Sequence, residues 1–590
     1  MLPALFPAVP AIAANQNRIT ANITNSSRAE LGDSVQPRAR IAADQGPAPN
    51  EMKLTGLSLR FSMTDVQSAA LDQLLADQQN PASPHYHQWL TPAEFGAQFG
   101  LSQADIAKVT AWLTAQGFTV TGVANSGTFV TFDGTVAQAD AAFGTSIHNL
   151  LSNNEQHFAN VTNATVPVAL ANVVGGITGL HNFRPHARLG MVAHPRFTSS
   201  VSGSHYVAPG DFYAIYDMEP LLSGGFNGAG IGTGANCHSV GGVTCGDIAV
   251  LGQVDLYNNG TSDVLAFRQA AGLSTSNLPV TVHEGGDPGQ AQTCTNCFPD
   301  VNDLQEASLD VEWAGAMAPG ASILFVNGPD VMINAMTQAI DLNLAPIITT
   351  SYGGCETAWG STELNSYNQL FKQAAAQGQT VLSSSGDSGA TDCDAAAPAM
   401  EGLAVDFPAS SPYVTAMGGS MFNEGSATGA TTYWLGTDTT TFSAGSAVPA
   451  ADISARGYIP EAVWNEDSSS TGLSSTGGGV SAFFSKPAWQ AETGVPGMTT
   501  TVPADSSRDL PDLSLNAAAG HDAMLFCVQN SCVSGFRASV GGGLTVAGGT
   551  SFDSQAFGGM LALIEQKVGP ALPNGPRLGM VNPVLYALGN

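Results

Sequence analysis

The sequence predicts an α/β protein in which a mostly parallel sheet is covered by helices on both faces and preceded by an α+β unit. Two observations support this prediction. Strand and helix patterns alternate regularly from residue 247 to residue 385, and the strands are apolar. Such alternation is typical of a parallel sheet that is buried on both sides. A separate group of strands and helices, between residues 54 and 180, ends before this alternation begins.

Residues 1–49 are predicted to be a signal-like segment followed by an irregular, polar tail. The opening MLPALFPAVPAIAA resembles the apolar part of a secretory signal that ends in Ala11-Ile12-Ala13. No Lys or Arg precedes this apolar run, which is atypical of such a signal. We expect the protein to be secreted, by a route that the sequence leaves open.

Residues 50–190 are predicted to form one compact unit, and residues 191–204 a linker or cleavage region. The stretch 185–203 lacks strong periodicity and is rich in Ser, His, Arg and Pro. A compact unit before such a stretch indicates a propeptide, although a plain two-domain protein would give the same pattern. The expected elements of the unit are strands at 56–63, 119–123 and 128–132 and helices at 66–79, 103–116 and 136–143.

Residues 205–590 are predicted to form the larger domain. Functional groups collect at the carboxyl ends of the strands in sheets of this kind. Two of the predicted strands end in polar clusters, one at Ser351-Tyr352-Gly353 and the other around Asp387. The expected strands are 247–256, 322–326, 346–351 and 380–385, and the expected helices are 300–318, 330–344 and 361–378.

The composition excludes several classes of protein. Hydrophobic residues make up 43% of the 590 residues and charged residues only 11%, so general disorder is excluded. Eighteen Lys and Arg against 47 Asp and Glu give a net charge of −29, which disfavours nucleic acids and anionic membranes as partners. No apolar run is long enough to span a bilayer. The scarcity of ion-pairing residues suits an acidic extracellular setting, although compositional bias would give the same result.

The eight cysteines indicate disulfides and therefore an oxidising compartment. Three pairs are close in sequence, and Cys355 and Cys393 are left to pair with each other. Spacing suggests this pairing without proving it. A zinc site is the weaker interpretation, because the single C-x2-C has no partner pair. The three close pairs are Cys237/Cys245, Cys294/Cys297 and Cys527/Cys532.

Glu306 and Asp310 are the first candidates for chemistry. Residues four apart lie on the same side of a helix, so these two carboxylates are neighbours on the predicted helix 300–318. No Lys or Arg stands at helical spacing to neutralise them. Sharing a proton would raise one of the two pKa values and prepare a general base. The alternative is an ordinary polar helix face near a helix N-terminus, where acids are favoured.

Asp387 and Ser551 lie in glycine-rich segments where a ligand could approach the backbone closely. Asp387 could bind a metal, form a turn or donate a hydrogen bond when protonated. Ser551 precedes a helical pattern and could be a nucleophile or a simple N-cap. The eleven histidines include no H-E-x-x-H motif and none stands out as a base, so no metal or cofactor site is placed.

Taken together, these segments resemble the sedolisin family of serine-carboxyl peptidases (peptidase family S53) with a kumamolisin-like prodomain. The resemblance runs from about residue 50 to the end of the chain. Three segments are similar to those that carry the family's Glu and Asp, its oxyanion aspartate and its nucleophile: EASLDVEWAGAMAPGA (306–321), SSSGDSGA (383–390) and GGTSFDSQAFGGMLALI (548–564). Supporting matches are SPHYHQWLTPAEFGAQFG (83–100), SYGGCE (351–356), FPASSPYVTAMGGS (407–420), GGGVSAFFSKPAWQ (477–490) and NPVLY (582–586).

The resemblance implies a subtilisin-like catalytic domain and a role for each candidate. Ser551 would be the nucleophile, Glu306 the base, and Asp310 the residue that supports the base. Asp387 would donate a hydrogen bond to the oxyanion, for which it has to be protonated. A carboxylate base and a protonated carboxyl donor coexist only near their pKa values, so an acid optimum follows. Ser351, Tyr352 and Gly353 are expected to bind substrate.

Two features depart from the family pattern. Gln555 stands where the family usually has Pro, which we interpret as a packing change. The family's calcium site lies in an Asp- and Gly-rich loop after NPxLY, and the sequence printed here ends at Asn590 without that loop. We therefore expect either a truncated sequence or a member that does without calcium.

The predicted function is a secreted, acid-acting serine-type endopeptidase made as a self-processing zymogen. Its partners would be protein or peptide substrates and its own prodomain, acting as an intramolecular inhibitor, and we expect a monomer. The main alternative is a secreted binding or surface protein that kept this fold and lost activity. A further alternative is an esterase or a Ser-His-Asp hydrolase, which would tolerate Glu306→Gln.

Overall fold

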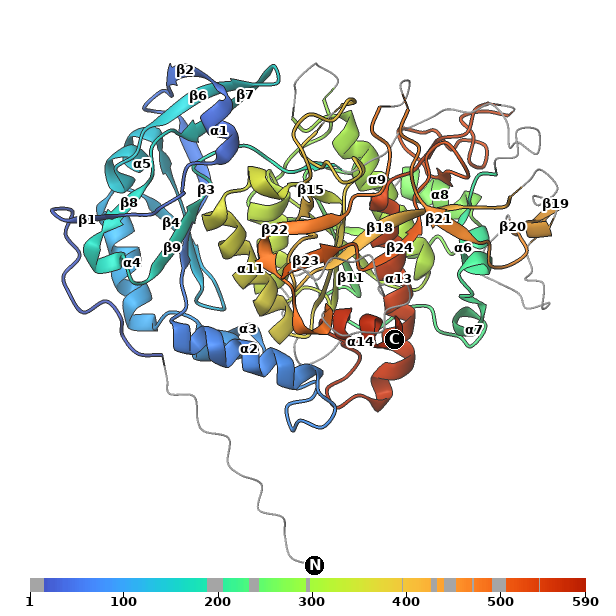
Figure 1. Ribbon diagram of the computed structural model, residues 1–590, viewed down its shortest axis with the longest axis horizontal. Coiled ribbons are helices and arrows are strands. Elements are labelled where there is room, and N and C mark those ends of the chain that lie inside the picture. The colour runs from blue at the N-terminus through green and yellow to red at the C-terminus, as the bar shows by residue number, and fades with distance from the viewer. Residues whose placement is uncertain are drawn as a thin grey trace, which may run out of the picture.

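The structure, a computed structural model, consists of an N-terminal unit that packs against the side of a larger domain (Figure 1). The family of elements predicted from the sequence is present: an α+β unit followed by a mostly parallel sheet with helices on both faces. The described residues are 15–187, 205–232, 244–260, 262–292, 298–394, 396–425, 432–439, 453–468, 472–490, 506–540 and 542–589.

The N-terminal unit is built on a four-stranded antiparallel sheet of order β4-β5-β3-β9. Three of its helices begin with a Thr and a Glu or Gln three residues later, which cap each other's backbone N–H groups. The strands are β3 (Lys53–Phe61), β4 (Thr119–Val123), β5 (Phe129–Thr135), β6 (Ile147–Ser152), β7 (Glu155–Asn160), β8 (Thr165–Pro167) and β9 (Val174–Thr178). The helices are α2 (Asp65–Gln79), α3 (Pro92–Phe99), α4 (Gln103–Ala115) and α5 (Val136–Phe143).

The prediction of an irregular tail is wrong for residues 28–47. Strand β1 (Arg28–Glu30) pairs with β8, helix α1 (Pro37–Ile41) follows, and β2 (Ala43–Pro47) pairs with β6. These strands are short and carry no apolar alternation, because strands more than 100 residues away in sequence hold them in place. The signal-like residues 1–14 and the predicted linker 191–204 lie outside the described residues.

The larger domain contains an eight-stranded sheet of order β12-β13-β11-β14-β16-β18-β21, with β24 paired to β18. All of its strand pairs are parallel except β18 with β21. Its strands are β11 (Ile248–Gly252), β12 (Val280–His283), β13 (Ile323–Asn327), β14 (Ile347–Thr350), β16 (Thr380–Ser384), β18 (Thr415–Phe422), β21 (Glu461–Val463) and β24 (Leu513–Asn516).

Further strands form small ribbons around this sheet. They are β10 (His186–Ala187), β15 (Tyr352–Cys355), β17 (Asp406–Phe407), β19 (Trp434–Thr439), β20 (Ile453–Ala455), β22 (Gly479–Ser485), β23 (Ser507–Leu510), β25 (Met524–Leu525) and β26 (Val546–Ala547). The helices of the domain are α6 (Pro209–Ile215), α7 (Glu219–Leu222), α8 (Asp263–Ala270), α9 (Val301–Met317), α10 (Thr337–Asp341), α11 (Ser361–Ala376), α13 (Thr550–Val568) and α14 (Asn582–Gly589). The helix predicted at 330–344 is divided into a π-helical turn at Val331–Met336 and the short α10.

Both faces of the sheet are buried, as the apolar strands predict. Successive residues of a strand point to opposite faces. Ile248 and Val250 of β11 therefore belong to the core on the α9 and α13 side, and Ala249 and Leu251 to the core on the α10 and α11 side. Helices α9 and α13 also pack against each other.

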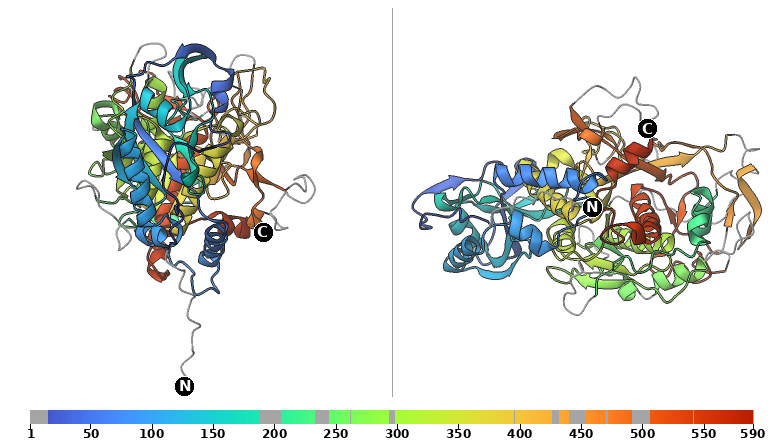
Figure 2. Two further views of the ribbon diagram at one scale, coloured as in Figure 1. Left: turned by 90° about the vertical axis from the view of Figure 1, so that its left-hand side faces the viewer. Right: turned by 90° about the horizontal axis from the view of Figure 1, so that it is seen from below.

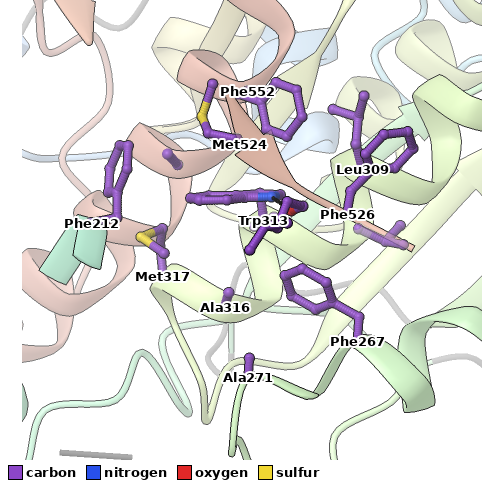
Figure 3. Close-up of a cluster of buried hydrophobic side chains, with 14 of the residues drawn as sticks. Phe212, Phe267, Ala271, Leu309, Trp313, Ala316, Met317, Met524, Phe526 and Phe552 are labelled. Carbon is purple, nitrogen blue, oxygen red and sulfur yellow. Dashed lines mark hydrogen bonds between the residues drawn. The ribbon is translucent and has the colours of Figure 1, made fainter. Parts of the chain in front are cut away.

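Trp313 lies at the centre of the core on the α9 and α13 side (Figure 3). It is fully buried, and its ring centroid is 5.4 Å from that of Phe212 and 5.5 Å from that of Phe552. Its indole Nε1 donates a hydrogen bond to the Leu525 carbonyl at 2.9 Å. Trp313 therefore fixes α9 against α13 and the β25 segment.

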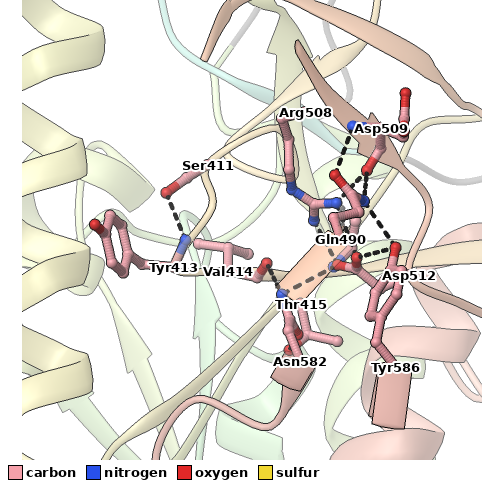
Figure 4. Close-up of polar contacts among 11 residues, drawn as sticks. Ser411, Tyr413, Val414, Thr415, Gln490, Arg508, Asp509, Asp512, Asn582 and Tyr586 are labelled. Carbon is pink, nitrogen blue, oxygen red and sulfur yellow. Dashed lines mark hydrogen bonds and ion pairs between the residues drawn. The ribbon is translucent and has the colours of Figure 1, made fainter. Parts of the chain in front are cut away.

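A buried polar network attaches the C-terminal helix α14 to the sheet (Figure 4). Arg508 and Asp512 form a fully buried ion pair, and the Tyr586 hydroxyl donates to Asp512 Oδ1 at 3.0 Å. Asn582 accepts a hydrogen bond from the Thr415 hydroxyl and donates to the Val414 carbonyl at 3.1 Å. The described residues after Tyr586 are Ala, Leu and Gly, whose side chains offer no oxygen to the calcium ion that the resemblance implies.

The N-terminal unit packs on helices α10 and α11, away from α9 and α13 (Figure 2). Asp341 of α10 accepts hydrogen bonds from the backbone N–H groups of Asn125 and Ser126, at 2.8 and 3.1 Å. Asp33 accepts from the Ser361 N–H at the start of α11, at 2.9 Å. Each unit therefore caps or extends elements of the other.

Two predicted disulfides are confirmed, Cys355–Cys393 and Cys527–Cys532, with Cα atoms 4.8 and 5.6 Å apart. The pairs Cys237/Cys245 and Cys294/Cys297 involve residues outside the described part of the chain. Among the helices that the structure describes, none is both long enough and apolar enough to cross a membrane.

Replacing Trp313 with Ala should lower the free energy of unfolding by about 3–5 kcal/mol, because it leaves a large cavity between α9 and α13. Urea unfolding followed by fluorescence would measure this, in a Ser551→Ala background that avoids self-cleavage. The exposed Val533→Ala serves as the control and should change stability by less than about 0.5 kcal/mol. Equal effects of the two substitutions would contradict the central role of Trp313.

Candidate active site

The candidate site lies where the neighbouring parallel strands β14 and β16 end. Ser351 directly follows β14, and Asp387 follows β16 after a short glycine-containing turn. Helix α9 brings Glu306 and Asp310 to the same place, and the first turn of α13 brings Ser551. Four of the residues singled out in the sequence, from segments up to 245 positions apart, are thus brought together.

Glu306 and Asp310 form a buried carboxyl pair, as their helical spacing predicts. Both side chains are fully buried. The Ser351 hydroxyl donates a hydrogen bond to Asp310 Oδ1 at 2.7 Å. Burial, and after it the charge of Asp310, raises the pKa of Glu306 well above its ordinary value. Burial also raises the pKa of Asp310, so the pair holds at least one proton over a wide range of pH.

Ser551 faces this carboxyl pair from the start of α13. The helix begins after Gly549, whose φ of +129° favours glycine, and Ser551 is fully buried in the first turn. The hydroxyl groups of Ser551 and Ser351 favour the ionised form of Glu306 and so oppose the rise in its pKa. A serine hydroxyl beside a carboxylate is the arrangement in which the carboxylate can accept the hydroxyl proton.

Asp387 is held beside Ser551 through Thr550. Its Oδ1 accepts hydrogen bonds from the Thr550 N–H at 2.8 Å and from the Thr550 hydroxyl at 3.0 Å. The preceding Gly386 has a φ of +101°, and a Cβ there would come within 2.5 Å of Asp392 Oδ1. The turn thus needs glycine to direct the Asp387 carboxyl towards the nucleophile segment.

Ser351, Tyr352 and Gly353 differ in what they present. The Ser351 side chain points to Asp310, and the Tyr352 side chain is fully buried, with its hydroxyl 3.3 Å from the Asp303 carbonyl that accepts its hydrogen bond. The backbone of Tyr352 and Gly353 forms β15, which pairs with β10 at the end of the N-terminal unit. Contacts of Tyr352 or Gly353 with a peptide would therefore come from their backbone.

Strand β10 runs antiparallel to β15, with His186 opposite Gly353 and Ala187 opposite Tyr352. Arg184 fixes this tail to the larger domain. Its Nε donates to the Pro329 carbonyl at 2.7 Å, and its guanidinium carbon lies 3.7 Å from the centre of the Phe298 ring. The end of the N-terminal unit thus occupies a strand edge that begins directly after Ser351.

Gln555 belongs to the polar network of the site, beyond the packing change predicted for it. Its Nε2 donates to the Ser351 hydroxyl at 3.1 Å, and its Oε1 accepts from the Thr349 hydroxyl at 2.5 Å. Ser351 passes this chain of hydrogen bonds on to Asp310. The signal in the sequence was a polar residue four positions after Ser551, on the same side of the helix.

Asp553 was missed in the sequence. It is fully buried in α13, and neither of its carboxylate oxygens has a hydrogen-bond partner among the described residues. Burial raises its pKa well above the ordinary value, and the charges of Asp387 and Glu461 add to the rise. Acidic residues in the first turn of a helix are usually exposed, so its position alone gave no signal of burial.

Comparisons with known proteins agree with this architecture. Residues 42–183 match the family described as "Pro-kumamolisin, activation domain". The chain is 30% identical to sedolisin of Pseudomonas sp. (strain 101) over 513 residues, which cover 84% of this chain and 74% of that protein. It is 28% identical to kumamolisin of Bacillus sp. (strain MN-32) over 575 residues, covering 95% and 88%. Tripeptidyl-peptidase 1 of Homo sapiens is 25% identical over 536 residues, covering 90% and 82%.

Among solved structures, Pseudomonas sedolisin, a serine-carboxyl proteinase complexed with two molecules of pseudo-iodotyrostatin, is similar to this chain. The identity is 26% and the TM-score 0.43, and the match covers 65% of this chain and 85% of that one.

Replacing Asp553 with Asn should stabilise the protein at pH 8 relative to pH 4. A carboxyl whose pKa is raised on folding makes the folded state less stable as pH climbs above the ordinary value of 3.8. Asn cannot ionise, so the gain should grow by ~1.4 kcal/mol for each pH unit in that window. Urea unfolding at both pH values, in the Ser551→Ala background, measures it.

The exposed Asp65→Asn is the matched control and should show the same small effect at both pH values. An Asp553→Asn variant whose stability relative to its parent is the same at pH 4 and pH 8 would show that Asp553 titrates normally.

Proposed function

Because the chain belongs to the sedolisin family of serine-carboxyl peptidases, we propose that it is the zymogen of a secreted, acid-acting endopeptidase with Ser551 as its nucleophile. The observation that carries the proposal is the buried meeting of Ser551 with the carboxyl pair Glu306 and Asp310, beside Asp387. No histidine takes part in the hydrogen bonds printed for these four residues, which favours a carboxylate as the base.

In the proposed reaction, Ser551 Oγ attacks the carbonyl carbon of the scissile peptide bond while Glu306 accepts the hydroxyl proton. Asp310 holds Glu306 in place and shares its proton. Asp387, when protonated, donates a hydrogen bond to the oxyanion of the tetrahedral intermediate. Glu306 then gives its proton to the leaving amine, and water hydrolyses the acyl-enzyme by the same steps in reverse.

Acid conditions suit this chemistry because Glu306 has to be ionised while Asp387 is protonated. Carboxyls outside the site point the same way. Burial raises the pKa of Asp211 and of Asp303 to about 6 and that of Glu565 to about 8. Each of these groups makes the folded chain less stable as pH rises from its ordinary pKa to the raised value. The fold therefore favours an acidic environment.

The N-terminal unit is proposed to inhibit the peptidase until it is removed. Strand β10 occupies the edge of β15, the position at which a peptide substrate could add as a strand beside Tyr352 and Gly353. Ser551 is also fully buried in the full-length chain. Both observations support a latent precursor. Calcium takes no part in this proposal.

The precursor should process itself at acid pH. Mass spectrometry of the purified wild-type chain, held at about pH 4 and about pH 7, should show loss of the first ~190–205 residues only at the lower pH, a span taken from the predicted linker. The Ser551→Ala chain should stay intact at both. A wild-type chain that stays intact at both pH values, and is inert towards added peptides, would favour a binding protein on the same fold.

Replacing Glu306 with Gln should lower kcat/KM for a peptide substrate at pH 4 by ~1,000-fold or more, because the base is lost. Glu312→Gln is the matched control. Glu312 is also buried on α9, but its carboxylate accepts a hydrogen bond from the Cys527 N–H at 2.9 Å, away from Ser551. We expect this variant to keep activity. Similar activity in both variants would instead indicate a Ser-His-Asp hydrolase.

A further inference from the structure

A second cluster of ionisable side chains lies at the same end of the sheet and takes no part in the proposed reaction. Glu424 follows β18, and His521 and Asp522 follow β24, which pairs with β18 in parallel. His205 comes from the first described stretch after the predicted linker. Its backbone N–H donates a hydrogen bond to Asp522 Oδ1, and the chain then continues beside Ala523, where the Val207 N–H donates to the Ala523 carbonyl at 2.9 Å.

The side-chain atoms of this cluster converge. His521 Nε2 lies 2.8 Å from Glu424 Oε2 and 3.1 Å from Asp522 Oδ2. His205 Nδ1 lies 3.8 Å from Asp522 Oδ1 and 4.0 Å from Glu424 Oε1. One ligand atom from each of His205, Glu424 and Asp522 lies within 4.8 Å of the others. A metal ion at about 2 Å from each ligand fits between atoms at such separations.

Two buried atoms of the cluster have no hydrogen-bond partner among the described residues. They are Asp522 Oδ2 and His205 Nδ1, and the Asp522 side chain is fully buried. Burial raises the pKa of Asp522 to about 8, so its ionised form lacks adequate compensation in the protein alone. A bound cation would satisfy both atoms and supply the missing positive charge.

Neighbouring groups hold the potential ligands in place. Trp434 Nε1 donates to Glu424 Oε1 at 2.8 Å, and the His205 ring stacks on the Trp434 ring with centroids 4.3 Å apart. Such supporting contacts are typical of metal sites, where they orient the ligands. The His521 side chain is 30% exposed, which gives an ion a route from solvent.

We propose that His205, Glu424, His521 and Asp522 bind one divalent transition-metal ion of the zinc type. Two imidazoles and two carboxylates are a ligand set suited to Zn²⁺ or Co²⁺, whereas Ca²⁺ prefers oxygen ligands alone. The ion would join the start of the larger domain to the ends of β18 and β24. Its role would be structural, and it does not depend on the proposed peptidase activity.

A second group, Asp255, His283 and Asp287, offers the matched control. It also brings three ligand atoms within 4.8 Å, but His283 is 40% exposed and Asp287 is exposed. The His283 Nδ1 already has a partner, Asn327 Oδ1 at 2.8 Å. We therefore expect this second group to bind metal weakly at best.

The test uses the full-length Ser551→Ala chain at pH 7, stripped with a chelator and then supplied with Zn²⁺, Co²⁺ or Ca²⁺ alone. Metal analysis after gel filtration should find one Zn²⁺ or Co²⁺ per chain and no retained Ca²⁺. Zn²⁺ should also raise the unfolding temperature. Asp522→Asn and His205→Gln should weaken Zn²⁺ binding by ~100-fold or more, whereas His283→Gln should leave it unchanged.

Asp522 is buried and its substitution could prevent folding, so the half-exposed His521→Gln provides an independent variant, with circular dichroism as the check on folding. It should fold and lose the Zn²⁺-dependent rise in unfolding temperature. The proposal is overturned if no stoichiometric Zn²⁺ is retained, if folded His521→Gln and His205→Gln chains bind Zn²⁺ like the parent, or if His283→Gln abolishes binding.

Discussion

The burial of two neighbouring carboxyls on one helix is the constraint on which the candidate site depends. Glu306 and Asp310 are both fully buried, so their ionised forms are costly and the pair has to share a proton. This arrangement holds only while α9 is clamped between the sheet and α13, with Trp313 as the central contact. The packing of the core and the protonation of the site are therefore one problem, because a shift of α9 would admit water and separate the pair from Ser551.

The direction of the strands explains why polar groups gather at one end of the sheet. In a parallel sheet the strands end along the same edge, and the segments that follow them meet there. Ser351 follows β14, Asp387 follows β16, Glu424 follows β18, and the His521-Asp522 segment follows β24. One edge thus carries two chemically different groups: a site of carboxyls and hydroxyls, and a mixed cluster of imidazoles and carboxylates.

Much of the sheet and part of the site could be predicted from the sequence, because local patterns determine them. Apolar runs fixed the strands, and helical spacing placed Glu306 beside Asp310. Features that depend on distant partners could not be predicted. Strands β1 and β2 exist only through pairing with β8 and β6, and the burial of Asp553 depends on what packs over the start of α13. The Tyr352 side chain turns into the core for the same reason.

The contacts between the two units suggest why acid would separate them. Strand β10 pairs with β15 over only two residues, so most of the attachment comes from elsewhere in the interface. Burial opposes ionisation of Asp33, but hydrogen bonds from Ser361 and Arg40 hold its pKa below the ordinary value. A group with a lowered pKa stabilises the folded assembly above its ordinary pKa, and that stability is lost as pH falls through the lowered value. Buried carboxyls such as Asp303 behave in the opposite way, since acid relieves their ionisation. Falling pH thus weakens a contact of the N-terminal unit while it stabilises the larger domain.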